Sequence, residues 1–223
     1  MGKKLVSLTA GMRVPYGGNN VAIVSEELAS EFESGDRLIV IQTTGDLLHI
    51  PSDVWDISYK TVEQAHNAFL EMGSVDDDSI TKFFKLFADY LSDDERFSAI
   101  KDSNDEDVRI ARSKGRSTTR LILSEKMRTD MVAGLRLWEN TPSQRGSTIE
   151  EINHDGWNVK LITAGLGAVG FIFEGRPNVF ADATGVLRSG NTVVFRIGSD
   201  ALLTANAIVC LLYTSDAADD DHC

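Results

Sequence analysis

The chain has 223 residues, of which 42% are hydrophobic and 25% charged, a composition typical of a soluble globular protein. Its formal net charge of -12 argues against a nucleic-acid partner, because proteins that bind DNA or RNA normally present a basic face. It contains no apolar run near the roughly 20 residues that span a bilayer, and no apolar stretch typical of a signal peptide, so we expect no membrane partner.

Residues 1–60 carry few periodic signals, and we expect an N-terminal extension there, with a small β element. The segment Arg37–Gln42 is rich in β-branched residues and follows Gly35-Asp36, which predicts a strand. Thr44-Gly45-Asp46 predicts a turn, and Leu47–Ile50 a partner strand.

Residues 61–146 have the apolar periodicity of helices. One helix has Val62, Ala65, Phe69 and Met72 on one face and ends at Gly73. Asp76-Asp77-Asp78 predicts the cap of the next helix, whose apolar stripe is Ile80, Phe83, Phe84, Phe87 and Leu91. Asn104 or Asp105 is expected to cap a third helix that runs to Lys114, and Ser124 to open a fourth with Met127, Met131, Leu135 and Trp138 on one face.

Residues 147–209 change to strand character. Residues 147–164 predict a hairpin, in which Asp155-Gly156 form the turn between Ile149–Asn153 and Trp157–Thr163. Residues 165–209 predict the start of a parallel sheet, with strands Ala168–Phe173 and Thr192–Ile197 joined by a helix over Asn178–Arg188. Both strands are continuous apolar runs, so we expect each to be buried on both faces. A last helix is expected over Asp200–Val209, capped by Ser199 or Asp200.

The final segment, residues 210–223, breaks this pattern. The string CLLYTSDAAD resembles the in-frame translation of a sequencing adapter, which predicts a non-native tail; a genuine acidic tail is the alternative. Both cysteines, Cys210 and Cys223, lie there, so residues 1–209 contain no thiol for a disulfide framework or a metal cluster. Because the histidines are isolated, we expect no metal site, and the scarcity of cysteine suits a reducing cytoplasm.

One motif invites a dinucleotide interpretation. Gly165-Leu-Gly167-Ala-Val-Gly170 matches the GxGxxG pattern, in which a helix must follow the glycines so that its N–H groups meet the pyrophosphate. Here the strand-like Phe171-Ile-Phe173 follows instead. We therefore interpret the match as a tight entry into a strand, with a true fingerprint as the alternative.

The run LGAVGFIFEGRPNVFADATGVLRSGNTVVFRIGSDA, residues 166–201, resembles the cofactor-domain signature of γ-glutamyl phosphate reductases. Residues 104–115, NDEDVRIARSKG, are similar to the helix before that domain. The resemblance covers about residues 60–209 and departs from the family at Gly165, where proline is usual. We expect that departure to change one turn and little else.

This resemblance implies a partial aldehyde dehydrogenase-like fold of the α/β class: a helical N-terminal layer, the start of a parallel Rossmann-like sheet, and an oligomerisation hairpin. It implies a reductase that uses NADP to convert γ-glutamyl phosphate into glutamate-5-semialdehyde in proline biosynthesis, as a homo-oligomer. That chemistry needs a thiolate, which residues 1–209 lack, so the chain is expected to be an inactive N-terminal part. A sister aldehyde dehydrogenase with another substrate, or a non-catalytic nucleotide-binding module, are the alternatives.

The resemblance also implies roles for single residues. Asn178 stands where the superfamily has an oxyanion-binding asparagine; the alternative is a helix N-cap. Arg196, near the end of the second parallel strand, could hold the 2′-phosphate of NADP with its guanidinium; the alternative is a solvated strand end.

The remaining site residues follow the two parallel strands. Phe173 and Glu174 are expected near the cofactor, and so are Gly198 and Ser199, which precede the last helix. Arg176 is expected to meet a phosphate or carboxylate of the substrate. A salt bridge from Arg176 to Glu174 or Asp182 is the alternative.

Overall fold

The structure, a computed structural model, describes residues 4–213. The chain divides into two compact units, Met1–Gln64 and Ala65–Cys223. The boundary falls inside one long helix, α2 (Ser52–Met72), which contributes residues to both units.

The first unit contains two antiparallel hairpins and a short helix. Strands β1 (Arg13–Tyr16) and β2 (Asn20–Ile23) form one hairpin, and β3 (Arg37–Val40) and β4 (Leu47–Ile50) the other. Helix α1 (Glu26–Glu31) lies between the hairpins in sequence. The core consists of Leu8, Val24, Leu28 and Phe32. The predicted strands at 37–42 and 47–50 are confirmed, the first two residues shorter, whereas β1, β2 and α1 were not predicted.

A buried carboxylate ties the elements of this unit together. The side chain of Asp36, only 5% exposed, accepts hydrogen bonds from the backbone N–H groups of Glu33 and Ser52, both at 2.8 Å. It also lies 2.7 Å from Nε2 of His49 on β4. The Glu33 bond and then the His49 contact lower the pKa of Asp36. The bond to Ser52 satisfies a free N–H group at the start of α2. The helix begins at Ser52, nine residues before Thr61, where the helical region was predicted to start.

The helices of the second unit follow the apolar stripes of the sequence. Helix α3 (Asp77–Ser92) is capped by Asp76, whose carboxylate accepts from the N–H of Ser79 at 2.6 Å. Helix α5 (Glu125–Asn140) is capped by Ser124, which accepts from Met127. Both predicted caps are confirmed. The stripe of α3 is also confirmed, because Ile80, Phe84, Phe87 and Leu91 are buried in the main core.

Helix α4 (Asp94–Ser113) corrects one prediction. It begins ten residues before Asn104, with Asp93 as its N-cap, whose carboxylate accepts from the N–H of Arg96 at 2.9 Å. Phe97 and Ile100 extend its buried face toward the N-terminus. Asn104 is therefore a buried mid-helix residue, and the polar run around it was mistaken for a helix start.

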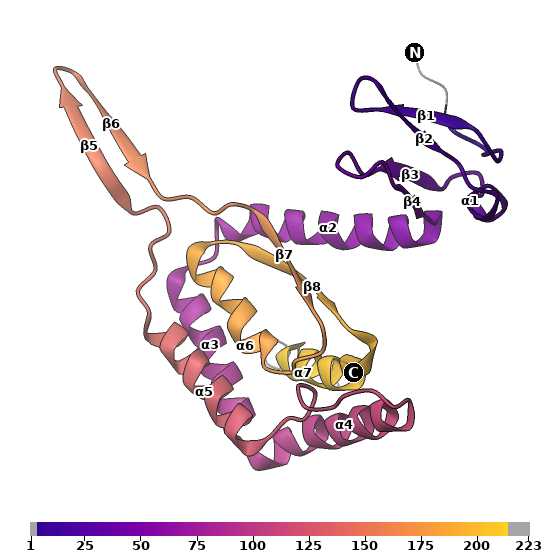
Figure 1. The fold of residues 1–223 in the computed structure, drawn as a ribbon. Helices are drawn as coiled ribbons and strands as arrows, with labels where there is room; N and C mark the ends of the chain where they lie inside the picture. The colour runs from indigo at the N-terminus through magenta and orange to yellow at the C-terminus, as the bar shows by residue number, and fades with distance from the viewer. Residues whose placement is uncertain (1–3, 214–223) are drawn as a thin grey trace. The chain divides into compact units, whose positions relative to one another are not determined.

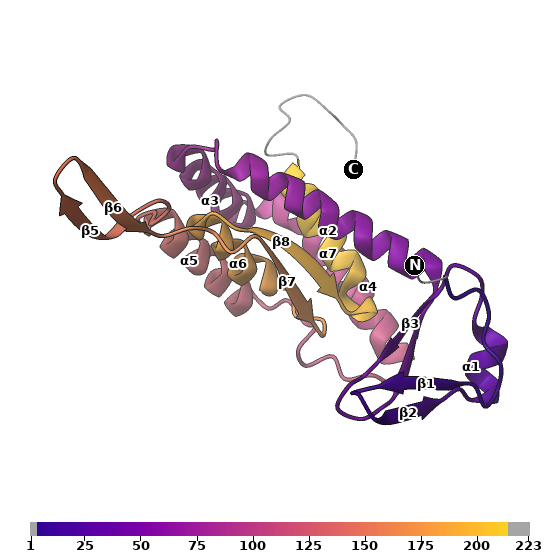
Figure 2. The ribbon, with the colours of Figure 1, turned by 90° about the horizontal axis from the view of Figure 1, so that it is seen from above.

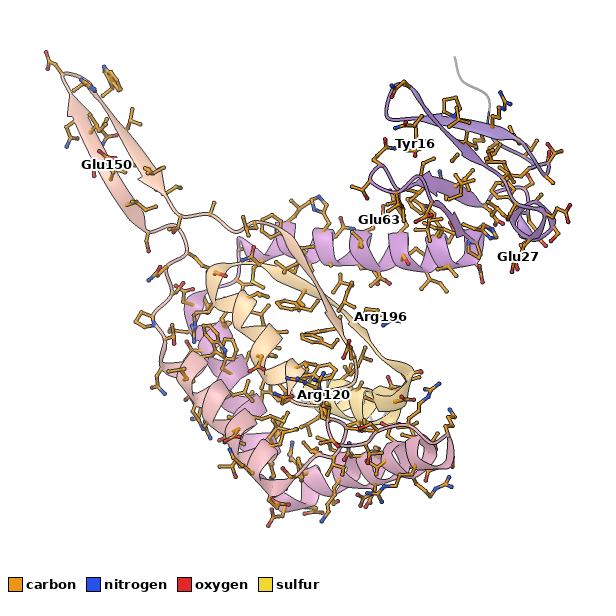
Figure 3. All side chains as sticks on the ribbon, viewed as in Figure 1. Tyr16, Glu27, Glu63, Arg120, Glu150 and Arg196 are labelled. Carbon is orange, nitrogen blue, oxygen red and sulfur yellow. The ribbon has the colours of Figure 1, made fainter. Side chains whose placement is uncertain are left out.

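The hairpin of β5 (Thr148–His154) and β6 (Trp157–Ile162) is confirmed, with its turn at Asp155-Gly156, where Gly156 has φ +81°. Every residue of both strands is exposed. Figure 1 shows the hairpin extending away from the helices of its unit, and Figure 3 shows its side chains, such as that of Glu150, surrounded by open space.

Strands β7 (Ala168–Phe173) and β8 (Thr192–Ile197) have the predicted bounds and pair in parallel, from Ala168 opposite Thr192 to Phe173 opposite Ile197. Their arrows run side by side in the same direction in Figures 1 and 2. The expectation that both faces are buried is wrong for β7, whose residues alternate between exposed and half-buried. Among the described residues only one face of this strand is covered.

The connection between these strands also differs from the single helix that was predicted. It is the short helix α6 (Val179–Ala183) followed by the 3₁₀ helix η1 (Thr184–Ser189), which ends at Gly190 with φ +76°. The predicted stop at Ser189-Gly190-Asn191 is confirmed. Phe180 of α6 packs on Phe195 of β8, with ring centroids 5.1 Å apart, so α6 covers the inner face of the sheet.

The main core joins α3, α4, α5, α6 and α7 (Leu202–Tyr213) to that inner face. Its fully buried members include Phe84, Leu91, Leu135 and Ile208. Arg188 of η1 is buried at the rim of this core, where it donates to the carbonyl of Trp138 and to the hydroxyl of Thr81. Burial lowers the pKa of Arg188, and its guanidinium lies over the ring of Phe84.

The start of the last helix corrects another prediction. A 3₁₀ turn, η2 (Ser199–Ala201), precedes α7 and includes both predicted caps, Ser199 and Asp200. The N-cap position of η2 is Gly198, which makes no side-chain hydrogen bond. Asp107 of α4 satisfies the first turn instead, accepting from the N–H groups of Leu203 at 3.3 Å and Thr204 at 2.8 Å. The helix continues to Tyr213, and Leu211 lies in the main core. The rest of the predicted tail lies outside the described residues.

The GxGxxG match leads directly into a strand, as predicted. Gly167 has φ +127°, and β7 begins at the next residue, so no helix N-terminus faces the glycines. The departure at Gly165 matters more than expected. A Cβ there would lie 2.4 Å from the carbonyl oxygen of Gly190 and 2.9 Å from the ring of Phe69, so this close approach needs glycine.

Gly185 tests how tightly η1 packs on α5. A Cβ at this position would lie 2.4 Å from ring atoms of Trp138, so Gly185→Ala is expected to lower the free energy of unfolding by about 1–3 kcal/mol through overpacking. Gly134 of α5 is the matched control, because a Cβ there meets nothing within 4 Å. Gly134→Ala should stabilise the helix by about 1 kcal/mol. Thermal unfolding followed by circular dichroism measures both; equal effects of the two substitutions would contradict the packing described.

Candidate functional site

The carboxyl ends of β7 and β8 form one edge of the sheet, which is where open α/β sheets bind ligands. Glu174, Gly175 and Arg176 follow β7, and Gly198 and Ser199 follow β8. The N–H of Gly198 donates to the carbonyl of Phe173 at 3.0 Å, so pairing continues one step past the strands. The two loops therefore start in contact.

Two glycines permit this contact. A Cβ at Gly198 would lie 2.7 Å from the carbonyl oxygen of Glu174, closer than real Cβ atoms come. Gly175 is buried and has φ +128°, a conformation that other residues rarely adopt. Gly198, predicted to bind cofactor, thus has a clear role in packing the two loops. Its role toward a cofactor stays a prediction.

A cleft of about 410 Å³ opens beside these loops. One wall comes from the segment between α4 and α5, the other from the loop after β7 and from η2. Its lining residues are Ser117, Thr119, Arg120, Leu121, Glu174, Gly175, Arg176 and Asp200.

Ion pairs cross this cleft. Nη1 of Arg120 lies 3.3 Å from a carboxylate oxygen of Glu174, and Arg116 pairs with Asp200. Arg176 makes no ion pair with any residue in the described range, so the predicted alternative, a salt bridge to Glu174 or Asp182, is wrong. Among the residues that line the cleft, Arg120 and Arg176 equal the carboxylates Glu174 and Asp200 in number, and Arg116, outside the lining, pairs with Asp200.

Asn178 stands two residues beyond the cleft, at the N-cap position of α6. It has a helical conformation, φ -69° and ψ -13°, and its side chain makes no capping hydrogen bond. Its Oδ1 is buried without a partner among the described residues. The side chain therefore does not cap α6. The oxyanion role stays a prediction.

Arg196 lies elsewhere on the sheet. It stands opposite Ile172 in the pairing, and both are exposed, so the two side chains share the open face rather than the face that packs on α6. Arg196 makes no ion pair within the described part of the chain. Figure 3 shows Arg120 and Arg196 apart, on different elements.

The other two predicted cofactor residues differ in burial. Phe173 packs against the main core, with its ring 5.6 Å from that of Phe171 and 6.4 Å from that of Phe195. Ser199 is exposed at the first position of η2. The structure thus brings Glu174 and Arg176 together in the cleft, and leaves Phe173, Ser199 and Arg196 outside its lining.

Sequence reasoning missed the opposite wall. The run Arg116-Ser-Thr-Thr-Arg120 follows the helix stop at Gly115, and two arginines around small hydroxyl residues were a signal of a polar loop. Asn104 and Asp107 were also missed, because single polar residues inside a helix carry no periodic signal. They hold the cleft wall and α7 in place through buried hydrogen bonds.

A second cavity, of about 350 Å³, lies at the opposite, amino edge of the sheet, between Phe69, Gly165 and Gly190. Its charged residue, Arg145, is bound to Asp77 at 3.0 Å, to the carbonyl of Met72 at 3.0 Å and to that of Val75. Because the protein itself occupies the guanidinium of Arg145, this cavity has fewer free hydrogen-bond donors for a ligand than the cleft. Within residues 4–213 no group of three or more acidic, histidine or cysteine side chains is placed to hold a metal. None of the described helices is long and apolar enough to cross a membrane.

Comparison with known proteins gives one consistent result. No protein-family model matches the chain. The γ-glutamyl phosphate reductase of Moorella thermoacetica is 37% identical over 120 residues, which are 52% of this chain and 29% of that enzyme. That of Pelodictyon phaeoclathratiforme is 29% identical over 157 residues, 70% of this chain and 37% of the relative. The resemblance predicted from the sequence is confirmed. This chain is similar to γ-glutamyl phosphate reductases.

Solved structures agree. The γ-glutamyl phosphate reductase of Thermotoga maritima superposes with a TM-score of 0.65 and 28% identity, over 71% of this chain and 40% of that structure. The enzyme of Saccharomyces cerevisiae, at 20% identity and a TM-score of 0.64, supports the fold alone. The chain is thus α/β, and it spans about a third of the length of its curated relatives.

Proposed function

We propose that this chain is the nucleotide-binding part of a cytoplasmic reductase that uses NADPH to convert γ-glutamyl phosphate into glutamate-5-semialdehyde, a step of proline biosynthesis. The observation that carries the proposal is the similarity to the Thermotoga maritima γ-glutamyl phosphate reductase, which extends over 71% of this chain with 28% identity. The position of the cleft, at the carboxyl edge of a parallel sheet, is where such a fold takes ligands.

The residues present suit this chemistry. Bound NADPH would supply the hydride. Reduction of an acyl phosphate places negative charge on the carbonyl oxygen, and the side-chain NH2 group of Asn178, on a side chain that does not cap α6, can donate a hydrogen bond to it. Arg176, unpaired and lining the cleft, can bind the phosphate or the carboxylate of the substrate. Glu174, Gly198 and Ser199 would border the cofactor.

Arg196 suits the 2′-phosphate that distinguishes NADPH from NADH. Its guanidinium is exposed near the end of β8 and has no carboxylate partner within residues 4–213, so it is available to an anion. Phe173, the last residue of β7, would pack beneath the cofactor, because its side chain lies against the main core.

The exposed hairpin suits a role in self-association. Ile149, Trp157 and Leu161 are each more than half exposed, on a hairpin that packs against nothing in the described part of the chain. Clusters of exposed apolar side chains commonly mark interfaces. We assign β5 and β6 to contacts with a second copy of the chain.

The proposed activity is tested on the gene product at the length of its relatives, by following NADPH oxidation with γ-glutamyl phosphate. Asn178→Ala should lower kcat by about 10²–10³-fold, because one oxyanion donor is lost, and should leave the KM for NADPH nearly unchanged. Asn158→Ala is the control, since the amide of Asn158 donates to Glu151 on the hairpin and, among the described residues, to no other side chain. Faster turnover of another acyl phosphate or aldehyde would indicate a sister enzyme, and NADPH binding without turnover a non-catalytic module.

Cofactor choice is tested at Arg196. Arg196→Ala should weaken NADPH binding about tenfold, as expected for loss of a charge-assisted hydrogen bond, and leave NADH binding unchanged. Fluorescence titration of both nucleotides measures this. Equal weakening of the two would show that Arg196 does not contact the 2′-phosphate.

Self-association is tested at Trp157. Light scattering on protein eluting from a gel-filtration column should give a mass above that of one chain, and Trp157→Lys should return it toward the monomer by placing a charge in the interface. Leu137→Lys, at an exposed position of α5, is the matched control and should change nothing. A monomeric wild-type chain at micromolar concentration would contradict the assignment.

A further inference from the structure

The segment between α4 and α5 presents an arginine to the cleft on a rigid backbone. We propose that Arg120 is an anion-binding residue of the cleft, which exchanges its ion pair with Glu174 for the phosphate group of a small phosphorylated ligand. The inference rests on the proposed function only in taking this cleft as the ligand site.

The backbone on the C-terminal side of Arg120 is fixed by Asn104. The amide nitrogen of this side chain donates to the carbonyl of Leu121 at 2.9 Å, and its Oδ1 accepts from the N–H of Leu123 at 2.8 Å. Asn104 is only 3% exposed, and its amide also reaches the hydroxyl of Thr204 on α7, at 3.1 Å. Because buried polar groups keep their hydrogen bonds, the position of Leu121 is set by α4 and α7.

Two further contacts fix the same segment. Leu121 is 4% exposed and packs with Val108 and Ala111 of α4 and with Ala201 of η2. Its N–H donates to the carbonyl of Thr118 at 3.0 Å, which closes a turn around Arg120. These contacts fix the backbone on the C-terminal side of Arg120 at the cleft.

The guanidinium itself is held weakly. Its contact with Glu174, at 3.3 Å, joins two side chains that are 67% and 88% exposed. Exposed ion pairs of this kind contribute little to stability. A phosphate offers the guanidinium of Arg120 more oxygen acceptors and more negative charge than the carboxylate of Glu174, so it can displace Glu174.

The opposite side of the cleft supplies a second cation. Arg176 follows β7, lines the same cleft and has no ion-pair partner in the described range. A dianion between Arg120 and Arg176 would meet two guanidinium groups, and Glu174 would compete with it for Arg120. Replacing Arg120 should therefore weaken phosphate binding, whereas replacing its partner Glu174 should strengthen it.

The probe is inorganic phosphate, titrated into the full chain and followed by NMR chemical shifts. Arg120→Ala should raise the Kd at least fivefold, Arg120→Lys should raise it less, and Glu174→Gln should lower it about threefold because the competing carboxylate is gone. If the Arg120–Glu174 ion pair only stabilised the fold, Arg120→Ala and Glu174→Gln would both weaken phosphate binding or both leave it unchanged. Circular dichroism melts check that each variant is folded.

Arg109→Ala is the matched control, because Arg109 on α4 is about as exposed as Arg120 and, within residues 4–213, pairs only with Glu106, outside the cleft. Equal effects of Arg109→Ala and Arg120→Ala, weaker binding in Glu174→Gln, or no phosphate binding by the wild-type chain would each overturn the proposal. The measurement needs neither NADPH nor turnover. Phosphate binding at Arg120 in a protein that fails to reduce γ-glutamyl phosphate would refute the proposed function alone.

Discussion

The buried polar side chains of α4 hold the second unit in one arrangement. Asp107 accepts hydrogen bonds from the first turn of α7 and from the hydroxyl of Thr204, and Asn104 binds both sides of the segment before α5. Both are 3% exposed. Because a buried donor or acceptor without a partner costs about 1–3 kcal/mol, α4, α7 and that segment can pack in one register only.

The hydrogen bonds of Asp107 and Asn104 also determine the geometry of the candidate site. Asp200 and Ala201 stand immediately before α7, and Arg120 immediately before Leu121, so the cleft walls are placed by Asp107 and Asn104. On the sheet side, Gly198 and Gly175 let the two loops approach closely. The resulting cleft has Arg176 on the sheet side and Arg120 on the opposite wall, in a chain whose net charge is -12.

Local signals in the sequence predicted most elements well. Apolar stripes located α3 and α5, Asp76 and Ser124 were recognised as caps, and β7 and β8 were predicted residue for residue. The failures have two causes. The start of α4 has a local signal that was passed over, the N-cap Asp93, whereas the open face of β7 depends on which neighbours pack there.

The sequence by itself determined the local structure and the likeness to γ-glutamyl phosphate reductases, because periodicity, caps and turns act over three or four residues and the motif of residues 166–201 is continuous. Tertiary structure alone decided which side chains meet. Asp107 caps a helix whose first turn contains Thr204, 97 residues later, and Arg120 pairs with Glu174, 54 residues later. Such contacts arise when the chain folds back on itself, and no local pattern encodes their partners.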